Sequence, residues 1–193
     1  LCCGKGNTLF AAKYKCGIKK EIVSMKQPDT ARLGSEDTFS IIGKEWMLVT
    51  AGTPDHFNTM TASWGGLGWL WNRPVAFIFV RPERYTHQFI EETDRLTLAF
   101  LGDGHRKALS LCGTLSGRDC DKVAQAGLTP VLVAGGCVTF SQARLTVVGR
   151  KLYRTEMRPE EFLDKETLAR WYGPETGGFH TVYVIGIEEV LED

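Results

Sequence analysis

Short apolar runs separated by turn residues dominate the pattern of hydrophobic and polar positions along this chain. Residues 46–51, 75–80, 96–101 and 181–190 are apolar-rich segments of strand length. Glycine or proline closely follows the first three, and these residues interrupt strands. The run at 75–80 is apolar throughout, which is typical of a buried strand. The pattern therefore predicts strands at these positions and a further β region over 135–153.

Helical signals are short and irregularly placed among these runs. They cover residues 87–93 after Thr86 as N-cap, 106–111 with an end at Gly113, 121–126 closed by Gly127, and a helix that begins at Pro159. Hydroxyl caps, C-terminal glycines and first-turn prolines are common helix boundaries. Strands dominate without regular strand–helix alternation, so we expect a mostly β fold, a β-barrel with peripheral helices.

One predicted strand alternates hydroxyl and apolar side chains and then runs into a glycine-rich loop. Residues 58–64 read Asn-Thr-Met-Thr-Ala-Ser-Trp, and residues 65–68 read Gly-Gly-Leu-Gly. The hydroxyl residues are Thr59, Thr61 and Ser63, which alternate with Met60, Ala62 and Trp64. Such a face suits a planar ligand with carbonyl and ring-nitrogen acceptors, with Trp64 as a flat neighbour. The alternative is an ordinary half-buried strand, since threonine is common in sheets.

A compact group of phosphate-binding residue types follows the apolar run at 75–80. Arg81, Arg84 and Thr86 lie within six residues of sequence, at the predicted start of a helix. Guanidinium groups, a hydroxyl and a helix N-terminus are groups that bind phosphate. The alternative is a pair of surface arginines that flank a turn.

Two further blocks complete a characteristic order of motifs. Residues 116–122 read Ser-Gly-Arg-Asp-Cys-Asp-Lys, and Phe179-His180 precedes the last predicted strand. Together with the two blocks above, they resemble the flavin reductase-like, FMN-binding split-barrel family, and most closely its flavoredoxin-type members. The resemblance covers residues 39–189. It implies a six-stranded Greek-key FMN-binding split barrel.

The resemblance also implies FMN as the cofactor, together with a set of residues that bind it. These residues are Asn58, Thr59, Thr61, Ala62, Ser63, Trp64, Arg81, Arg84, Thr86, Lys122 and His180. Arg81 and Thr86 are expected at the phosphate, with Arg84 as a further candidate. Residues 58–63 are expected at the edge of the isoalloxazine ring, with Trp64 close to the ring or the ribityl chain.

Two of these residues have distinct expected roles. Lys122 would stabilise the reduced flavin or pair with phosphate, and the alternative is a solvated lysine at a helix start. His180 would donate a hydrogen bond to the flavin or to a substrate as an auxiliary group, and the alternative is a structural histidine. No catalytic side chain is expected, because the chemistry of a flavoprotein resides at flavin N5.

The activity that the resemblance implies is electron transfer through bound FMN, as in an NAD(P)H:flavin oxidoreductase. Hydride would come from NAD(P)H, and electrons would pass to free flavin or to a redox protein. A flavoredoxin-type carrier without NAD(P)H activity of its own and a non-catalytic FMN-binding module are the alternatives. We expect a homodimer, because residues 69–71 (Trp-Leu-Trp) and 77–79 (Phe-Ile-Phe) are more apolar than the surface of one small barrel.

Composition narrows the range of functions further. The 23 basic and 23 acidic side chains leave no net charge, so nucleic acid is not an expected partner. No apolar run has the length of a membrane span, and the six cysteines and four histidines lack the spacing of a metal site. Unpaired cysteines fit a reducing, cytoplasmic location. We interpret residues 1–24 as a disordered leader or tail and residues 25–193 as a single FMN-binding domain.

Overall fold

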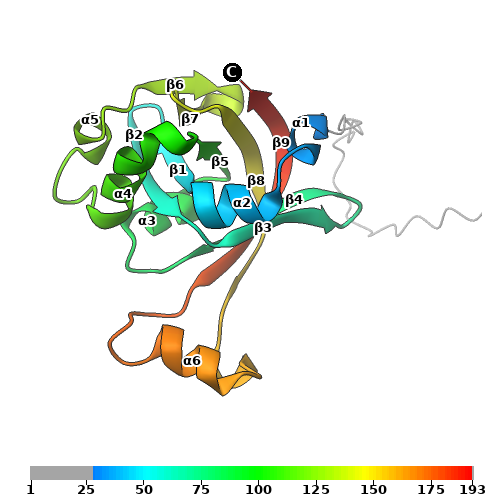
Figure 1. The fold of residues 1–193 in the computed structure, drawn as a ribbon, viewed down its shortest axis with the longest axis vertical. Helices are drawn as coiled ribbons and strands as arrows, with labels where there is room; N and C mark the ends of the chain where they lie inside the picture. Colours follow the sequence, from blue (N-terminus) through cyan, green and yellow to red (C-terminus); the bar gives the residue numbers. More distant parts are fainter. Residues whose placement is uncertain (1–27, 193) are drawn as a thin grey trace, which may run out of the picture.

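The computed structural model describes residues 28–192, and its centre is an antiparallel sheet of seven strands in the order β2-β1-β5-β8-β9-β4-β3 (Figure 1). These strands are β1 (Met47–Thr53), β2 (His56–Ala62), β3 (Gly65–Leu70), β4 (Arg73–Val80), β5 (Arg95–Phe100), β8 (Leu145–Glu156) and β9 (Thr181–Glu192). A separate two-stranded sheet pairs β6 (Pro130–Val133) with β7 (Cys137–Phe140). The leader or tail expected at residues 1–24 lies outside the described residues.

One hydrophobic core explains why these runs form a barrel-like sheet. Buried side chains from β1, β2, β4, β5, β8 and β9 join in a single cluster, to which α3 adds Phe89 and Ile90. The sheet does not close on itself, since β2 and β3 are its two edges. The expected mostly β split barrel with peripheral helices is thus confirmed. The main sheet has seven strands rather than the six that the resemblance implied, because residues 65–70 also form a strand.

Short helices and helical turns lie around the sheet, except for α6, which projects away from it (Figure 1). They are α1 (Ala31–Gly34), α2 (Thr38–Ser40), a π-helical turn (Ile41–Glu45), α3 (Tyr85–Glu92), α4 (Arg106–Thr114), α5 (Lys122–Gln125), α6 (Lys165–Tyr172) and 3-10 turns at Asp103–His105, Ala134–Gly136 and Pro159–Glu161. The helices expected near 106–111 and 121–126 are confirmed. A second apolar cluster lies under α4 and includes the fully buried Cys112. No helix within residues 28–192 has the length and apolar character needed to traverse a bilayer.

The segment at residues 65–68, expected as a loop, forms the first part of the edge strand β3. Gly65 pairs with Ile78 of β4, and a Cβ added to Gly65 would lie 2.7 Å from the backbone oxygen of Phe77. Glycine therefore permits an approach of two backbones that a side chain would block. The expectation was wrong because the glycines indicate close packing here rather than a turn.

The expected N-cap of α3 was also wrong. The helix begins at Tyr85 after Arg84, and Thr86 lies buried within its first turn. The Thr86 hydroxyl accepts a hydrogen bond from Asn58 Nδ2 at 2.7 Å. A partner from a distant strand, and not the helix terminus, therefore determines the role of this threonine.

The helix expected to begin at Pro159 is a single 3-10 turn, Pro159–Glu161. The α-helix of this region, α6, begins only after Asp164, whose carboxylate accepts the backbone N–H of Glu166 at 3.0 Å. Both positions have a residue that favours the start of a helix: a first-turn proline at Pro159 and an N-cap aspartate at Asp164. The capped start is the one that continues into an α-helix.

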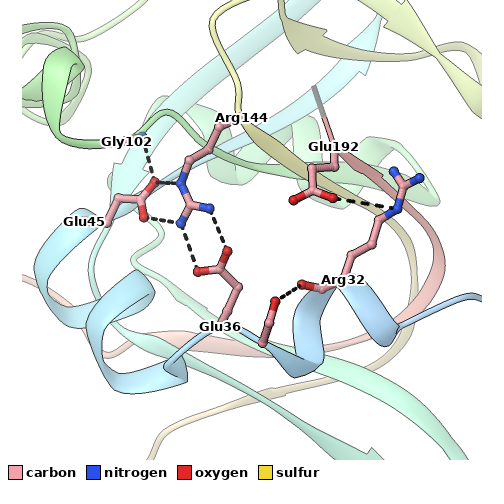
Figure 2. Close-up of polar contacts among 7 residues, drawn as sticks. Arg32, Glu36, Glu45, Gly102, Arg144 and Glu192 are labelled. Carbon is pink, nitrogen blue, oxygen red and sulfur yellow. Dashed lines mark hydrogen bonds and ion pairs between the residues drawn. The ribbon is translucent and has the colours of Figure 1, made fainter.

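An arginine attaches the N-terminal segment, residues 28–46, to the barrel (Figure 2). Arg144 Nη1 donates to Glu36 Oε1 and Arg144 Nη2 to Glu45 Oε2, each at 2.6 Å, and Glu45 Oε1 accepts the Gly102 N–H at 2.7 Å. The segment also places three side chains in the main core: Leu33, Ile41 and Ile42. Apolar burial and an ion-pair cluster thus hold it together.

Residues 157–180, here called the arm, leave the barrel between β8 and β9 and project away from it (Figure 1). The β8–β9 ladder runs out to the pair Glu156–Thr181, and the Met157 N–H donates to His180 O at 3.0 Å, which closes the root of the arm. Helix α6 has no buried residue, and Leu163 is 99% exposed. The outer part of the arm therefore contributes little to the core.

Candidate functional site

A cavity of about 190 Å³ lies where the ends of β2 and β4 meet the root of the arm. Its lining residues are Met60, Thr61, Ala62, Ser63, Trp64, Phe79, Arg81, Arg84 and His180. A second cavity of about 270 Å³ adjoins it, since Met60 and Arg84 line both. Together they reach the lower part of the range of small-molecule sites, roughly 300–1,000 Å³. The structure thus brings parts of the predicted binding blocks to one place.

Neighbouring strand ends explain how distant residues meet here. Arg81 directly follows β4, and His180 directly precedes β9. These strands pair with Val80 opposite Thr181, so Arg81 and His180 leave the sheet side by side. Ser63 reaches the same cavity from the connection between β2 and β3.

The predicted row of hydroxyls is largely used inside the protein. The Thr59 hydroxyl is buried against that of Thr50, 2.8 Å away, and Thr59 lines neither cavity. The Thr61 hydroxyl donates to Leu109 O of α4 at 2.5 Å, although Thr61 also lines the first cavity. Ser63 lines that cavity too, and its hydroxyl makes no hydrogen bond within the part of the chain that the structure describes. This face therefore fixes α4 on β2 and leaves Ser63 for a ligand.

Asn58 and Thr86 bind each other instead of lining the first cavity. Gly117 of the 116–122 block packs directly on this pair, since a Cβ at Gly117 would collide with the side-chain oxygen of Asn58. Thr86 lines the second cavity. The pair thus fixes β2, α3 and the 116–122 loop relative to one another.

Arg81 binds backbone carbonyls of the arm. Its Nη2 donates to Trp171 O at 2.8 Å, and its Nη1 donates to Gly178 O at 2.9 Å and to Thr176 O. The guanidinium carbon also lies 5.2 Å from the centre of the Tyr172 ring. Arg81 therefore lines the first cavity while its terminal nitrogens hold the arm, and its contact with a phosphate stays a prediction.

Arg84 and Lys122 both bind the C-terminal end of α4, where carbonyl groups lack partners within the helix. Arg84 Nη1 donates to Gly113 O at 2.7 Å, and Lys122 Nζ donates to Cys112 O and Leu115 O at 3.3 and 3.2 Å. Lys122 is only 4% exposed, so the alternative of a solvated lysine was wrong. Desolvation lowers the pKa of this lysine. Both cations also line the second cavity.

His180 is a buried histidine with one defined polar partner. Its Nδ1 lies 2.8 Å from the Tyr172 hydroxyl, and its ring centre lies 5.1 Å from that of Trp64. Burial lowers the pKa of His180 to about 4, assisted by the positive charges of Arg81 and Arg84. The imidazole is therefore uncharged at neutral pH, and in this form it can donate a hydrogen bond to a ligand or accept one from it.

Positive charge dominates the first cavity, since Arg81 and Arg84 line it and no carboxylate from residues 28–192 does. In the second cavity the cations are Arg84, Arg118 and Lys122, and the anions are Glu83 and Asp119. Trp64, which is 40% exposed, adds a flat apolar surface. The arrangement suits an anionic ligand that also carries a planar ring.

Three residues that the sequence analysis did not single out complete the surroundings of the site. Trp171 meets Trp64 edge-on with ring centres 5.1 Å apart, Tyr172 contacts His180, and Arg118 lines the second cavity. Arg118 belongs to the recognised 116–122 block, so its position in that block was a usable signal. The two aromatic residues of α6 carry no such signal, because only the fold of the arm brings them into contact with Trp64 and His180.

Comparison with known proteins places this arrangement in a family. The sequence profile described as "Flavin reductase like domain" matches residues 39–190. The chain belongs to this flavin reductase-like family. Its matched region includes the strands, both cavities and the arm described above. No curated protein matches the chain.

Solved structures share the fold of this flavin reductase-like chain at low sequence identity. Flavoredoxin of Desulfovibrio vulgaris (Miyazaki F) is 21% identical, with a TM-score of 0.59 over 77% of this chain and 69% of that one. An FMN-binding protein from Thermus thermophilus is 20% identical, with a TM-score of 0.60 over 77% and 71% of the chains. An NADH:FAD oxidoreductase from Streptomyces globisporus is 17% identical, with a TM-score of 0.58 over 77% and 75%. The family and the shared fold support a flavin-binding redox function.

Proposed function

We propose that this flavin reductase-like protein binds FMN in its two adjoining cavities and acts as an NAD(P)H:flavin oxidoreductase. The observation that carries the proposal is the lining of the first cavity: two arginines, a neutral histidine and an exposed tryptophan, without a carboxylate. Membership of the family supports a flavin as the ligand. Two proteins of similar fold, an FMN-binding protein and an NADH:FAD oxidoreductase, support the same class of chemistry.

The residues present fit the three parts of FMN. The phosphate is anionic, and Arg84 lines both cavities while its guanidinium makes one hydrogen bond, to Gly113 O, within residues 28–192. The flat ring system suits the exposed face of Trp64, and its polar edge suits the Ser63 hydroxyl. The ribityl chain of FMN carries hydroxyl groups, which suit the polar side chains that line the two cavities.

The side chains of the protein have binding and electrostatic tasks in this proposal. Bound FMN supplies hydride acceptance from a nicotinamide nucleotide and electron release to a flavin or a redox protein. Arg84 and Lys122 provide positive charge near the ligand, which stabilises anionic groups. His180 provides a neutral hydrogen-bonding group, and Trp64 excludes water from one side of the ring.

A spectroscopic experiment tests the proposal directly. Purified protein titrated with FMN should show the absorption bands of a bound flavin, with FMN bound more tightly than riboflavin, which lacks the phosphate. Anaerobic mixing with NADH and then NADPH should bleach these bands. A protein that stays colourless after addition of FMN would contradict the proposal.

The same experiment separates the two alternatives. A flavoredoxin-type carrier would bind FMN and accept electrons from a reduced redox protein or dithionite, yet keep its colour with both nucleotides. A non-catalytic FMN-binding module would bind FMN without passing electrons to cytochrome c or free flavin. The reaction with a nucleotide therefore decides between enzyme and carrier.

We also propose that the protein forms a homodimer through the β3–β4 hairpin. Trp69 and Trp71 are 65% and 56% exposed at its tip, whereas Ile78, from the other expected apolar segment, is fully buried. Trp71 and Asn72 both have positive φ, 49° and 57°, a conformation that costs a tryptophan roughly 1–2 kcal/mol. Light scattering at micromolar concentration should report twice the chain mass, and Trp69→Glu should lower it to that of a monomer. A wild-type monomer that binds FMN would contradict this proposal.

A further inference from the structure

Two residues directly after β4 hold the same short stretch of the arm from opposite sides. Arg81 donates to the carbonyl oxygens of Trp171, Thr176 and Gly178. The Glu83 carboxylate accepts the N–H of Gly178. A cation thus binds the acceptors of this loop and an anion binds its donor, so both polarities of the backbone are matched.

The glycines of this loop are required for that approach. Gly177 has φ +87°, and a Cβ there would lie 3.0 Å from Arg81 Nη1. A Cβ on Gly178 would lie 2.6 Å from Glu83 Oε1. The loop and the two charged side chains are therefore closely fitted to each other, and we call this group of four residues the clamp.

The clamp determines what the arm presents to the first cavity. Trp171 lies at the end of α6, next to the clamp, and meets Trp64 edge-on with ring centres 5.1 Å apart. His180 lies two residues beyond Gly178, and Tyr172 binds its Nδ1 at 2.8 Å. His180 lines the cavity, and Trp171 and Tyr172 contact the lining residues Trp64 and His180. We call these three side chains of the arm the wall.

Besides the clamp, the contacts within the described residues that attach this wall to the barrel are the Met157–His180 backbone hydrogen bond at the root of the arm and the ring contacts with Trp64. Helix α6 has no buried residue. The arm's own aromatic group stacks internally, with Tyr172 and Phe179 parallel at 4.9 Å, and so gives the arm shape without attaching it to the barrel. A segment with few buried apolar contacts opens easily, so a small number of polar contacts governs its position.

We propose that Arg81 and Glu83 are positioning residues that hold the arm against the barrel, and that the wall so formed controls how the electron donor reaches the cavity. This inference rests on the proposed function, because it concerns access of a nicotinamide nucleotide to that site. It also reassigns Arg81, whose terminal nitrogens already hold three carbonyls. The phosphate then depends on Arg84.

Glu83 separates this role from phosphate binding. Its removal deletes a negative charge, which does not weaken the attraction of the site for an anion. Gly178→Ala opens the clamp by steric conflict and changes no charge. Glu175→Ala is the matched control, because Glu175 is an exposed carboxylate of the same loop with no hydrogen bond or ion pair in the described structure.

Amide hydrogen exchange tests the clamp directly and does not require the protein to show enzymatic activity. Glu83→Ala and Gly178→Ala should each speed amide exchange in residues 171–180 by roughly tenfold or more, as expected for losing a hydrogen bond to a charged group. Glu175→Ala should leave it unchanged, and Glu83→Gln, which keeps an acceptor oxygen, should restore part of the protection. Equal exchange in all variants would overturn the clamp.

Steady-state kinetics with NADH and NADPH measures the consequence. The KM for the reactive nucleotide should rise severalfold in Glu83→Ala and Gly178→Ala, while the Kd for FMN changes less than the KM does. Faster exchange with unchanged KM would overturn control of donor access, and so would a parallel loss of FMN affinity. If wild-type protein binds FMN but reacts with neither nucleotide, the proposed enzyme function and the role in donor access are both wrong. The hydrogen-exchange data then still test whether Arg81 and Glu83 hold the arm.

Discussion

The N-terminal segment and the arm are both attached to the barrel by an arginine, but they are attached in different ways. Arg144 binds the carboxylates of Glu36 and Glu45 (Figure 2). The N-terminal segment, to which these glutamates belong, also buries apolar side chains in the main core. Arg81 binds backbone carbonyls of the arm, and helix α6 of the arm has no buried residue. The first attachment supports the whole fold, whereas the second governs the position of one local element. Mutations in the two regions should therefore affect different measurements.

The largest contrast is expected for apolar truncation. Ile41→Ala removes a side chain that is almost fully buried in the main core, so the free energy of unfolding should fall by about 3 kcal/mol. Leu163→Ala, in the arm, should change it by less than about 0.5 kcal/mol. Urea denaturation followed by circular dichroism measures both. Similar losses would show that the arm is as integral to the fold as the N-terminal segment.

Acidification should affect the two regions in separate pH ranges. His180 has a pKa of about 4 in the folded protein, below the unfolded value near 6.5. The unfolded chain therefore binds more protons between these values, and stability should fall by up to about 3 kcal/mol as pH drops from 6.5 towards 4. Hydrogen bonds from Arg144 lower the pKa of Glu36, so its contribution is lost only at lower pH. In His180→Gln, the free energy of unfolding should depend less on pH between 6.5 and 4. A pH profile identical to that of the wild type would contradict the assignment of this range to His180.

Removal of the barrel arginine that binds the N-terminal segment should lower the free energy of unfolding slightly less. Arg144→Ala leaves Glu36 and Glu45 without their shared cation, and we expect a loss of about 2–3 kcal/mol, since the pair is only partly buried. Arg32→Ala is the control: Arg32 lies 3.9 Å from Glu192 with both side chains about half exposed, and such pairs contribute about 0–1 kcal/mol. Thermal unfolding compares the two. Equal effects would mean that the Arg144 cluster is no stronger than a surface ion pair.

The smallest effect is expected for the aromatic partner of His180. Tyr172→Phe removes the hydroxyl that contacts both His180 Nδ1 and Met157 Sδ. The free energy of unfolding should fall by about 1 kcal/mol, while the ring contacts remain. Nuclear magnetic resonance of the imidazole nitrogens should show a changed tautomer balance of His180. Tyr153→Phe, at an exposed tyrosine of β8, should change neither quantity. A tautomer balance that is the same in Tyr172→Phe would contradict the pairing.

Strands could be predicted from the sequence where they are buried, because buried strands are rich in apolar residues. The runs at 75–80, 96–101 and 181–190 became β4, β5 and β9 because core strands need apolar side chains. Strand β3 could not be predicted, because the glycine at its start, Gly65, is required by a close approach to the backbone of Phe77, which lies in another strand. The exposed strand β6 was missed for a similar reason, because its side chains carry no burial pattern.

The site could be predicted as a set of blocks but not as a set of contacts. Ser63, Trp64, Arg81, Arg84 and His180 do line one cavity. The partners of individual side chains depended on chain segments far away in sequence: Arg81 binds the arm and Lys122 binds the end of α4. A residue type indicates which bonds are possible, and only the fold determines which neighbour takes them.

The ladder that closes the root of the arm makes the arm an exchangeable module. Strands β8 and β9 remain paired, through two register shifts, out to Glu156 and Thr181. The entropy of closing such a loop grows only slowly with its length, by about 0.6 kcal/mol per doubling. Insertions, deletions or whole replacements within residues 157–180 can therefore alter the mouth of the cavity while the barrel keeps its alignment. For protein engineering, this loop is the position at which a different substrate preference can be grafted onto an unchanged scaffold.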